Sequence, residues 1–211
     1  MTRTSGAPAG GGVAAIKRTF RRNRIAAVLL ISFLAAMLYG SVLIAQSDAG
    51  LKEQLQFLTQ EYFTTRGEQP ILSTFLSSLS TSALYLVSAF FLGFFAFGQP
   101  VCVFIVLFRG FGLGISMGQI YLNYQMNGFL YCLVLIAPVA VLFTLVLISA
   151  LKDSIQMSNL FLALFFPKLG TATVEALKTY GIRYLAYAIL AVVIAALDAG
   201  MNFLFSGILP L

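Results

Sequence analysis

Residues 107–118, LFRGFGLGISMG, place an arginine inside a long apolar run and repeat glycine at every fourth position. In a water-soluble helix each glycine would cost about 1 kcal/mol relative to alanine. Apart from Arg109, the run from 101 to 121 carries no charge. It is long enough to cross about 30 Å of hydrocarbon. The stretch therefore predicts a membrane-spanning helix.

The composition of the whole chain points to the same solvent. Of the 211 residues, 60% are hydrophobic and only 9% are charged, and the mean hydropathy is +0.94. Soluble domains usually carry about 25% charged residues. We expect an all-α fold, a polytopic integral membrane helix bundle that forms a single domain.

Five apolar runs are long enough, or nearly so, to span the bilayer. They cover residues 25–45, 74–97, 101–121, 129–150 and 183–206. Gly98-Gln99-Pro100 predicts a turn after the second run, because proline blocks the continuation of a helix. Tyr124–Gly128 (YQMNG) predicts a short turn after the third run.

Lysine and arginine predict the orientation of these spans, because cytoplasmic loops carry an excess of both. Six of the 13 basic residues lie in 1–24, which we interpret as a basic cytoplasmic tail ahead of the membrane domain 25–208. The segment 46–73 is rich in acids and is expected outside, whereas 151–182 forms a basic cytoplasmic elbow. Five transmembrane helices then run N-in/C-out. Since the net charge of +6 is concentrated in the tail, it indicates membrane lipid as a partner and no nucleic acid.

Two connecting segments carry helical patterns of their own. In 49–63, an apolar face recurs at helical spacing, made by Leu51, Leu55, Leu58 and Tyr62. It either rests on the outer face of the bundle or docks an extracytoplasmic partner. In 156–182, Pro167 is expected to interrupt helical structure before an amphipathic helix at Thr173–Tyr180. This helix either anchors the elbow to the membrane or contacts a cytoplasmic protein.

Arg109 is a charge deep in the third span. Eight residues from Val101 place it about 12 Å along the helix, where a charge costs about 2.5–3.5 kcal/mol and usually faces a partner. Asp198 is the one acid within a predicted span. We predict an intramembrane pair of Arg109 and Asp198, which either fixes the register of two helices or has a role in transport or catalysis.

The glycines of the third span form one stripe along the helix. Gly110, Gly114 and Gly118 follow a GxxxGxxxG pattern, which allows two helix backbones to approach closely. The stripe predicts tight packing against another helix of this chain. A homodimer face, or a face for another protein, is the alternative.

Hydroxyl side chains gather at the start of the second run. They are Ser73, Thr74, Ser77, Ser78, Ser80, Thr81 and Ser82. Such hydroxyls bond back to their own helix or across to neighbours, so helix packing is one interpretation and a polar pathway is the other.

Catalytic patterns do not emerge from the sequence. Histidine is absent, and with it the commonest metal ligand and general base at neutral pH. No zinc motif, P-loop or GxSxG is present. Cys102 and Cys132 are expected to be too far apart to bridge. We therefore predict a protein that is not an enzyme and has no catalytic residues, metal or cofactor.

Three stretches carry a resemblance to a known family. They are FFLGFFAFGQPVCVFIVLFRGFGLGISMG (90–118), IAPVAVLFTLVLISALK (136–152) and LAVVIAALDAGMNFLF (190–205). In their order and spacing, these stretches resemble the small-residue-rich helices, the proline-bearing fourth helix and the last helix of the stage II sporulation protein M family.

The resemblance implies a multi-pass protein of the cell membrane that acts in endospore engulfment. It implies a non-enzymatic scaffold that recruits two cell-wall hydrolases, the stage II sporulation proteins D and P, to the septal membrane for peptidoglycan remodelling. The outer segment 48–70 and the glycine stripe would be the docking surfaces. Association with further copies of this chain, as a homo-oligomer, is an alternative. The alternative is the membrane subunit of a transporter served by a separate ATPase, with Arg109 and Asp198 lining a path.

Overall fold

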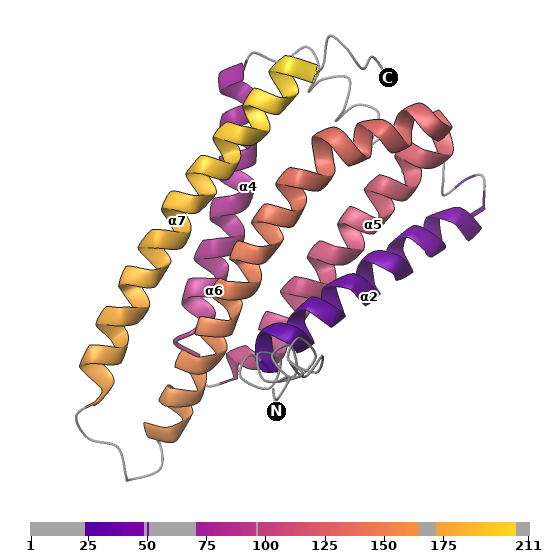
Figure 1. Ribbon diagram of the computed structural model, residues 1–211. Coiled ribbons are helices and arrows are strands. Elements are labelled where there is room, and N and C mark those ends of the chain that lie inside the picture. The colour runs from indigo at the N-terminus through magenta and orange to yellow at the C-terminus, as the bar shows by residue number, and fades with distance from the viewer. Residues whose placement is uncertain (1–23, 49, 51–70, 96, 165–171, 206–211) are drawn as a thin grey trace, which may run out of the picture.

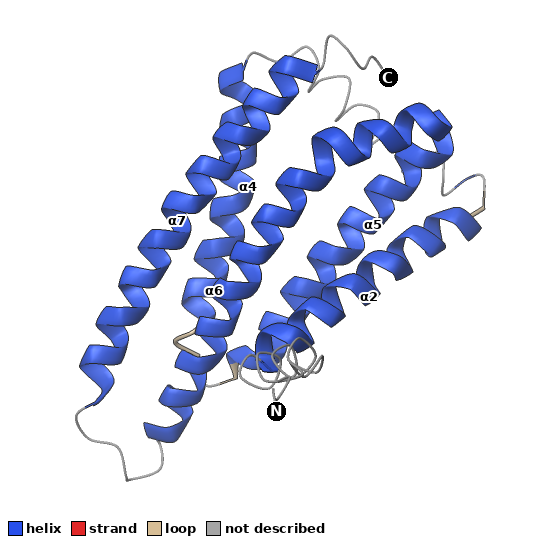
Figure 2. Ribbon diagram, viewed as in Figure 1, coloured by secondary structure: helices blue, strands red, loops and turns tan. Residues whose placement is uncertain are grey.

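Long helices make up almost all of the chain that the structure describes. The computed structural model describes residues 24–48, 50, 71–95, 97–164 and 172–205, and these ranges contain no strand (Figures 1 and 2). The elements are α2 (Arg24–Gln46), α4 (Ile71–Leu92), α5 (Gly98–Tyr131), the short π-helix η1 (Cys132–Ile136), α6 (Ala137–Leu164) and α7 (Ala172–Phe205). Five of their segments are long and apolar enough to cross a membrane. The predicted all-α bundle with five spanning helices is therefore confirmed.

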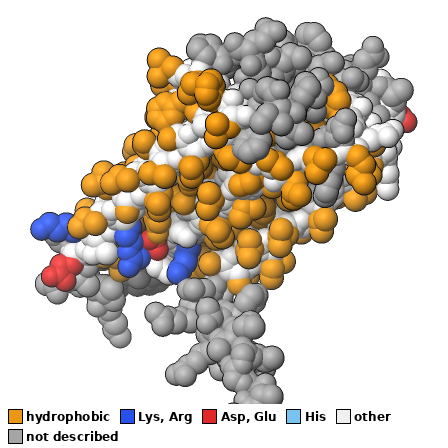
Figure 3. All heavy atoms as spheres, turned by 45° about the horizontal axis from the view of Figure 1, so that its top comes forward, with side chains coloured by type: hydrophobic (Ala, Val, Ile, Leu, Met, Phe, Trp, Pro, Cys, Tyr) orange, Lys and Arg blue, Asp and Glu red, His pale blue; other side chains and the backbone are white. Residues whose placement is uncertain are grey.

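The helices are at least as long as the hydrocarbon is thick. The 23 residues of α2 extend about 35 Å, and the 34 residues of α7 extend about 51 Å. Apolar side chains predominate on the described part of the face shown in Figure 3, and lysine and arginine side chains, with acids beside them, lie toward one end. That distribution is typical of a bundle whose sides contact lipid and whose end contacts water.

The helices form two packed groups that share one core. Helix α2 packs along α5, while α4, α6 and α7 pack against one another (Figure 1). Helix α6 joins the groups, because it contacts both α2 and α5. One buried apolar cluster includes Leu29 from α2, Leu86 from α4, Val106 from α5, Phe143 from α6 and Ile194 from α7.

The turn between α4 and α5 lies earlier than Gly98-Gln99-Pro100, so that prediction is wrong. Helix α4 ends at Leu92, and the N–H of Gly93 donates to the carbonyl of Phe90 at 3.2 Å. Helix α5 already begins at Gly98. Pro100 lies in its first turn, where the N–H that proline lacks would have no partner in the helix.

The turn between α5 and α6 lies where the sequence predicts it. The backbone of Gln125 leaves the helical region, with φ 47° and ψ −121°. Gly128 permits the chain to fold back, because a Cβ there would lie 2.5 Å from the carbonyl oxygen of Ile120. The π-helix η1 then precedes Pro138, and α6 bends near its start (Figure 1). Proline and π-helical turns are the usual causes of such bends.

Helices α6 and α7 extend beyond the apolar runs that predict them. Helix α6 continues to Leu164, and α7 begins at Ala172. The predicted segment Thr173–Tyr180 is helical, but it is the first part of α7 rather than a separate helix. Pro167 lies outside the described residues.

Candidate functional site

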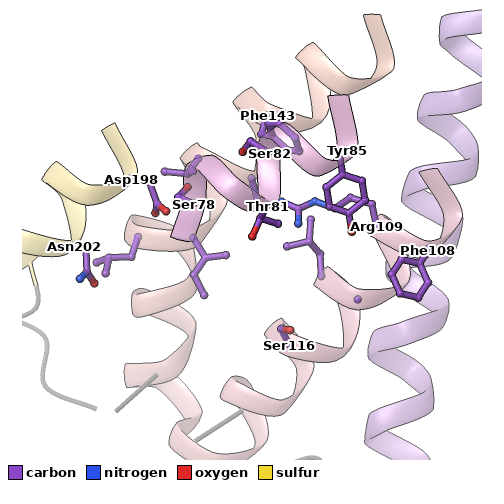
Figure 4. Close-up of a pocket in the computed structure, with 16 residues that line it drawn as sticks. Ser78, Thr81, Ser82, Tyr85, Phe108, Arg109, Ser116, Phe143, Asp198 and Asn202 are labelled. Carbon is purple, nitrogen blue, oxygen red and sulfur yellow. The ribbon is translucent and has the colours of Figure 1, made fainter. Parts of the chain in front are cut away.

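A cavity of about 310 Å³ lies among α4, α5, α6 with η1, and α7 (Figure 4). Its polar lining comes from three helices: Ser78, Thr81, Ser82, Arg109, Ser116, Asp198 and Asn202. Its apolar lining includes Phe108, Leu135, Ile136, Val139, Ala140 and Phe143. We call this space the Arg109 cavity. It combines a polar wall with an apolar one, as ligand sites usually do.

Arg109 enters this cavity beside two neighbouring aromatic rings. Its guanidinium carbon lies 5.3 Å from the ring centroid of Tyr85 and 5.2 Å from that of Phe143. Both distances are within the range of a cation–π interaction, which is stronger where water is excluded. The Nε atom of Arg109 is buried and has no hydrogen-bond partner among the described residues. The two rings therefore stabilise the charge without satisfying that donor.

Asp198 and Asn202 line the α7 side of the same cavity. They are one helical turn apart on α7 and stand across the cavity from Arg109 (Figure 4). Both have interaction partners in the structure. The predicted pair of Arg109 and Asp198 thus shares a cavity, and the contacts that surround the guanidinium are aromatic.

The hydroxyl side chains at the start of α4 divide between the helix backbone and the cavity. Thr81 donates to the carbonyl of Ser77 in its own helix at 3.0 Å. Ser78, Thr81 and Ser82 line the Arg109 cavity. Thr74 is buried, and its hydroxyl has no hydrogen-bond partner in the described part of the chain. The hydroxyl-rich segment therefore bonds to its own helix and also lines the cavity.

The glycine stripe of α5 lies against the backbone of α2. A Cβ on Gly110 would lie 2.5 Å from the carbonyl oxygen of Phe33, and one on Gly114 would collide with Met37. A Cβ on Gly118 would lie 2.6 Å from the side chain of Ile44. Since α2 covers all three positions, the stripe is not open to a second protein in this arrangement.

A buried acid near the other end of the bundle was not singled out by the sequence. Asp153 on α6 is only 7% exposed. Its Oδ1 accepts a hydrogen bond from Arg183 at 3.1 Å, and its Oδ2 accepts one from Tyr187 at 2.9 Å. The pair joins α6 to α7, and it explains why both helices continue through a segment that composition assigns to a loop.

Two more hydroxyls extend this contact to α4, and a third adds a bond between α7 and α6. Ser154 donates toward the carbonyl of Ala89 at 2.8 Å, and Tyr180 donates to the carbonyl of Phe90 at 2.9 Å. Tyr184 donates to the carbonyl of Ala150 at 3.0 Å. Since a helix leaves its last carbonyls unsatisfied, the bonds from Ser154 and Tyr180 stabilise the end of α4. The sequence signal is the spacing of tyrosines 180, 184 and 187, which places them on one face of α7.

The remaining predicted positions contribute no site in the described residues. The proposed outer face of Leu51, Leu55, Leu58 and Tyr62 lies outside them. Cys102 and Cys132 are buried free thiols. Where the structure describes the chain, no group of three or more His, Cys, Asp or Glu side chains could hold a metal ion.

Comparison with known protein families matches residues 28–201 to one family, Stage II sporulation protein M. The chain belongs to this family. The match runs from α2 to near the end of α7, so it includes the glycine stripe, Arg109 and Asp198. Neither the curated proteins nor the solved structures include one that matches the chain.

Membership of the stage II sporulation protein M family agrees with the helices of the structure. All five membrane-spanning segments overlap the matched residues. The chain is therefore a multi-pass membrane protein of a sporulation family. Asn202, on the α7 side of the Arg109 cavity, lies one residue beyond the match.

Proposed function

We propose that this protein is a non-enzymatic scaffold of the cell membrane that recruits cell-wall hydrolases during endospore engulfment. The observation that carries the proposal is the family match across all five spanning segments. The partners proposed are the stage II sporulation proteins D and P. They would remodel peptidoglycan at the septal membrane while the mother-cell membrane advances around the forespore.

The packing of the helices limits where such partners can bind. The glycine stripe is covered by α2, so it serves the internal packing of the scaffold. Exposed apolar side chains remain along the sides of the bundle, for example Leu72 and Leu84 on α4 and Leu185 and Ile189 on α7. These sides can contact lipid or the membrane anchors of partners. The segment 48–70 remains the proposed outer docking surface.

The proposal is tested by purifying the protein from sporulating cells in mild detergent and identifying its companions by mass spectrometry. We expect cell-wall hydrolases with membrane anchors. Replacing Leu55 and Leu58 together by serine should remove them, because both lie on the predicted apolar face of the outer segment. Replacing Gln56 and Thr59 by serine in the same segment is the matched control and should leave them bound.

A transporter subunit served by a separate ATPase is the second candidate, and the Arg109 cavity favours it. Hydroxyl, amide and charged side chains from three helices meet there, as they do along substrate paths in membranes. Recovery of a nucleotide-binding ATPase in the same purification, in place of hydrolases, would support this function and overturn the scaffold.

A further inference from the structure

We propose that the Arg109 cavity binds the ring of an isoprenoid quinone, a neutral molecule that dissolves in the hydrocarbon of the membrane. The carbonyl oxygens of the ring accept hydrogen bonds from the polar wall of the cavity, and the hydrocarbon tail stays among the acyl chains of the lipid. This site goes beyond the proposed engulfment role and does not depend on it, since it follows from the depth, charge and lining of the cavity.

The depth of the opening selects the class of ligand. Among the lining residues, Thr81 of α4 and Phe108 and Gly112 of α5 are exposed, so the cavity opens between these two helices. Thr81 lies about 15 Å along α4, which is about 33 Å long, and Phe108 and Gly112 lie about 15 and 21 Å along α5. Acyl chains surround a protein at that depth, where a charged group is costly. The ligand is therefore a molecule that dissolves among acyl chains.

The charges in the cavity favour a neutral ligand. Arg109 and Asp198 line the same space, so the lining has no net charge when both are ionised. Asp198 and Asn202 already have interaction partners, and the α7 wall therefore requires no cation. The Nε atom of Arg109 is buried, although the side chain as a whole is partly exposed. A ligand can therefore reach the guanidinium only at its terminal nitrogens.

The polar wall determines which functional group the ligand carries. Ser82 on α4 is buried, and its side chain lines the cavity together with Ser116 and Arg109 on α5 (Figure 4). Hydroxyl and guanidinium groups donate hydrogen bonds, and an acyl chain offers them no acceptor. A carbonyl oxygen is an acceptor without charge. A quinone carries two of them on opposite sides of one ring, so it can accept from both helices at once.

The apolar part of the lining suits the ring itself. Tyr85, Phe108 and Phe143 all border the cavity, and aromatic side chains pack well against flat rings. The volume of about 310 Å³ is at the lower end of small-molecule sites, which range over about 300–1,000 Å³. The space therefore suits a single substituted ring, with its tail leaving through the opening between α4 and α5.

The test is native mass spectrometry of the full-length protein in detergent, with graded amounts of decylubiquinone added. Decylbenzene is the matched probe, because it has a ring and the same tail but no carbonyl. Gly112→Leu fills the opening, since a Cβ at Gly112 meets nothing within 4 Å. Gly181→Leu is its control, because Gly181 is equally free of contacts but lies outside the cavity.

A second pair of variants tests the hydrogen bond to the ring. Ser82→Ala removes a buried hydroxyl from the cavity, and Ser80→Ala removes an exposed one from the same helix outside the cavity. Size-exclusion chromatography and circular dichroism establish that all four variants are folded.

We expect the wild type and both controls to bind decylubiquinone in preference to decylbenzene. Gly112→Leu should lose this binding, and Ser82→Ala should bind roughly two- to tenfold more weakly, since one hydrogen bond changes binding by about that factor. Equal binding of the two probes by the wild type would overturn the proposal, because the cavity would then respond to hydrocarbon alone. So would undiminished binding by Gly112→Leu, which would place the quinone elsewhere, or equal binding by Ser82→Ala and Ser80→Ala.

Discussion

Replacing Gly114 with alanine tests whether the contact of α2 with α5 holds the bundle together. A Cβ on Gly114 would collide with the carbonyl oxygen of Met37 and lie 2.9 Å from its carbonyl carbon, where ordinary contacts are 3.4–4 Å. The obstacle is backbone, so no side-chain rotation relieves it. Helix α2 must retreat from this point, which loosens the contact along the whole pair.

The magnitude follows from a comparison inside the same helix. Gly112→Ala is the matched control, since its Cβ meets nothing within 4 Å. Both substitutions gain about 1 kcal/mol of helix propensity. Only Gly114→Ala adds the cost of overpacking, which is typically about 1–3 kcal/mol. We therefore expect Gly114→Ala to be less stable than Gly112→Ala by about 1–3 kcal/mol, or roughly 2–12 °C in Tm for a chain of this size.

The assay uses the two cysteines, because the chain has no tryptophan to report unfolding by fluorescence. Cys102 is 0% exposed and Cys132 is 8% exposed, so a thiol-reactive fluorogenic dye labels them only as the bundle opens. Labelling is followed during heating in detergent. Equal melting temperatures for Gly114→Ala and Gly112→Ala would show that α2 does not pack closely against the glycine stripe.

Three further predictions use the same thermal labelling. Asp153→Asn should lower stability by about 1–3 kcal/mol, because it weakens two hydrogen bonds to a buried carboxylate; an unchanged Tm would mean that the pair is not formed. Ser154→Ala should lower it by about 1 kcal/mol by removing the bond to α4, whereas Ser149→Ala, whose hydroxyl bonds only to its own helix, should have little effect; equal shifts would contradict this. Tyr85→Leu removes one ring from Arg109 and should cost about 0.5–2 kcal/mol beyond Tyr85→Phe, which keeps the ring; equal stability of the two variants would exclude the cation–π contact.

The number of membrane-spanning helices could be predicted from the sequence, because membrane spanning depends on local composition. A run of about 20 apolar residues must form a helix in hydrocarbon, whatever its neighbours are. The glycine spacing of α5 likewise predicted a close helix contact. The turn at Gln125 was visible because Asn and Gly cluster around it. The N-in/C-out orientation stays a prediction from charge.

The ends of the helices were harder to predict from the sequence, because they depend on contacts between helices. Asp153 and Arg183 mark the elbow as polar by composition, yet each extends a helix because it is paired with the other across α6 and α7. Pro100 suggested a break, and the structure instead places it in the first turn of α5. A single charge or proline does not reveal which partner or which turn will accommodate it.

The amino-acid sequence by itself determined that this protein is a five-helix membrane bundle with an arginine and a glycine stripe in its third span. Tertiary structure decided that α2, far earlier in the chain, covers the stripe. It also decided that Arg109 lies beside the rings of Tyr85 and Phe143 and faces a cavity shared with Asp198. The physical reason is that spanning depends on the transfer of each segment into lipid, whereas the choice of neighbours depends on how the helix surfaces fit together.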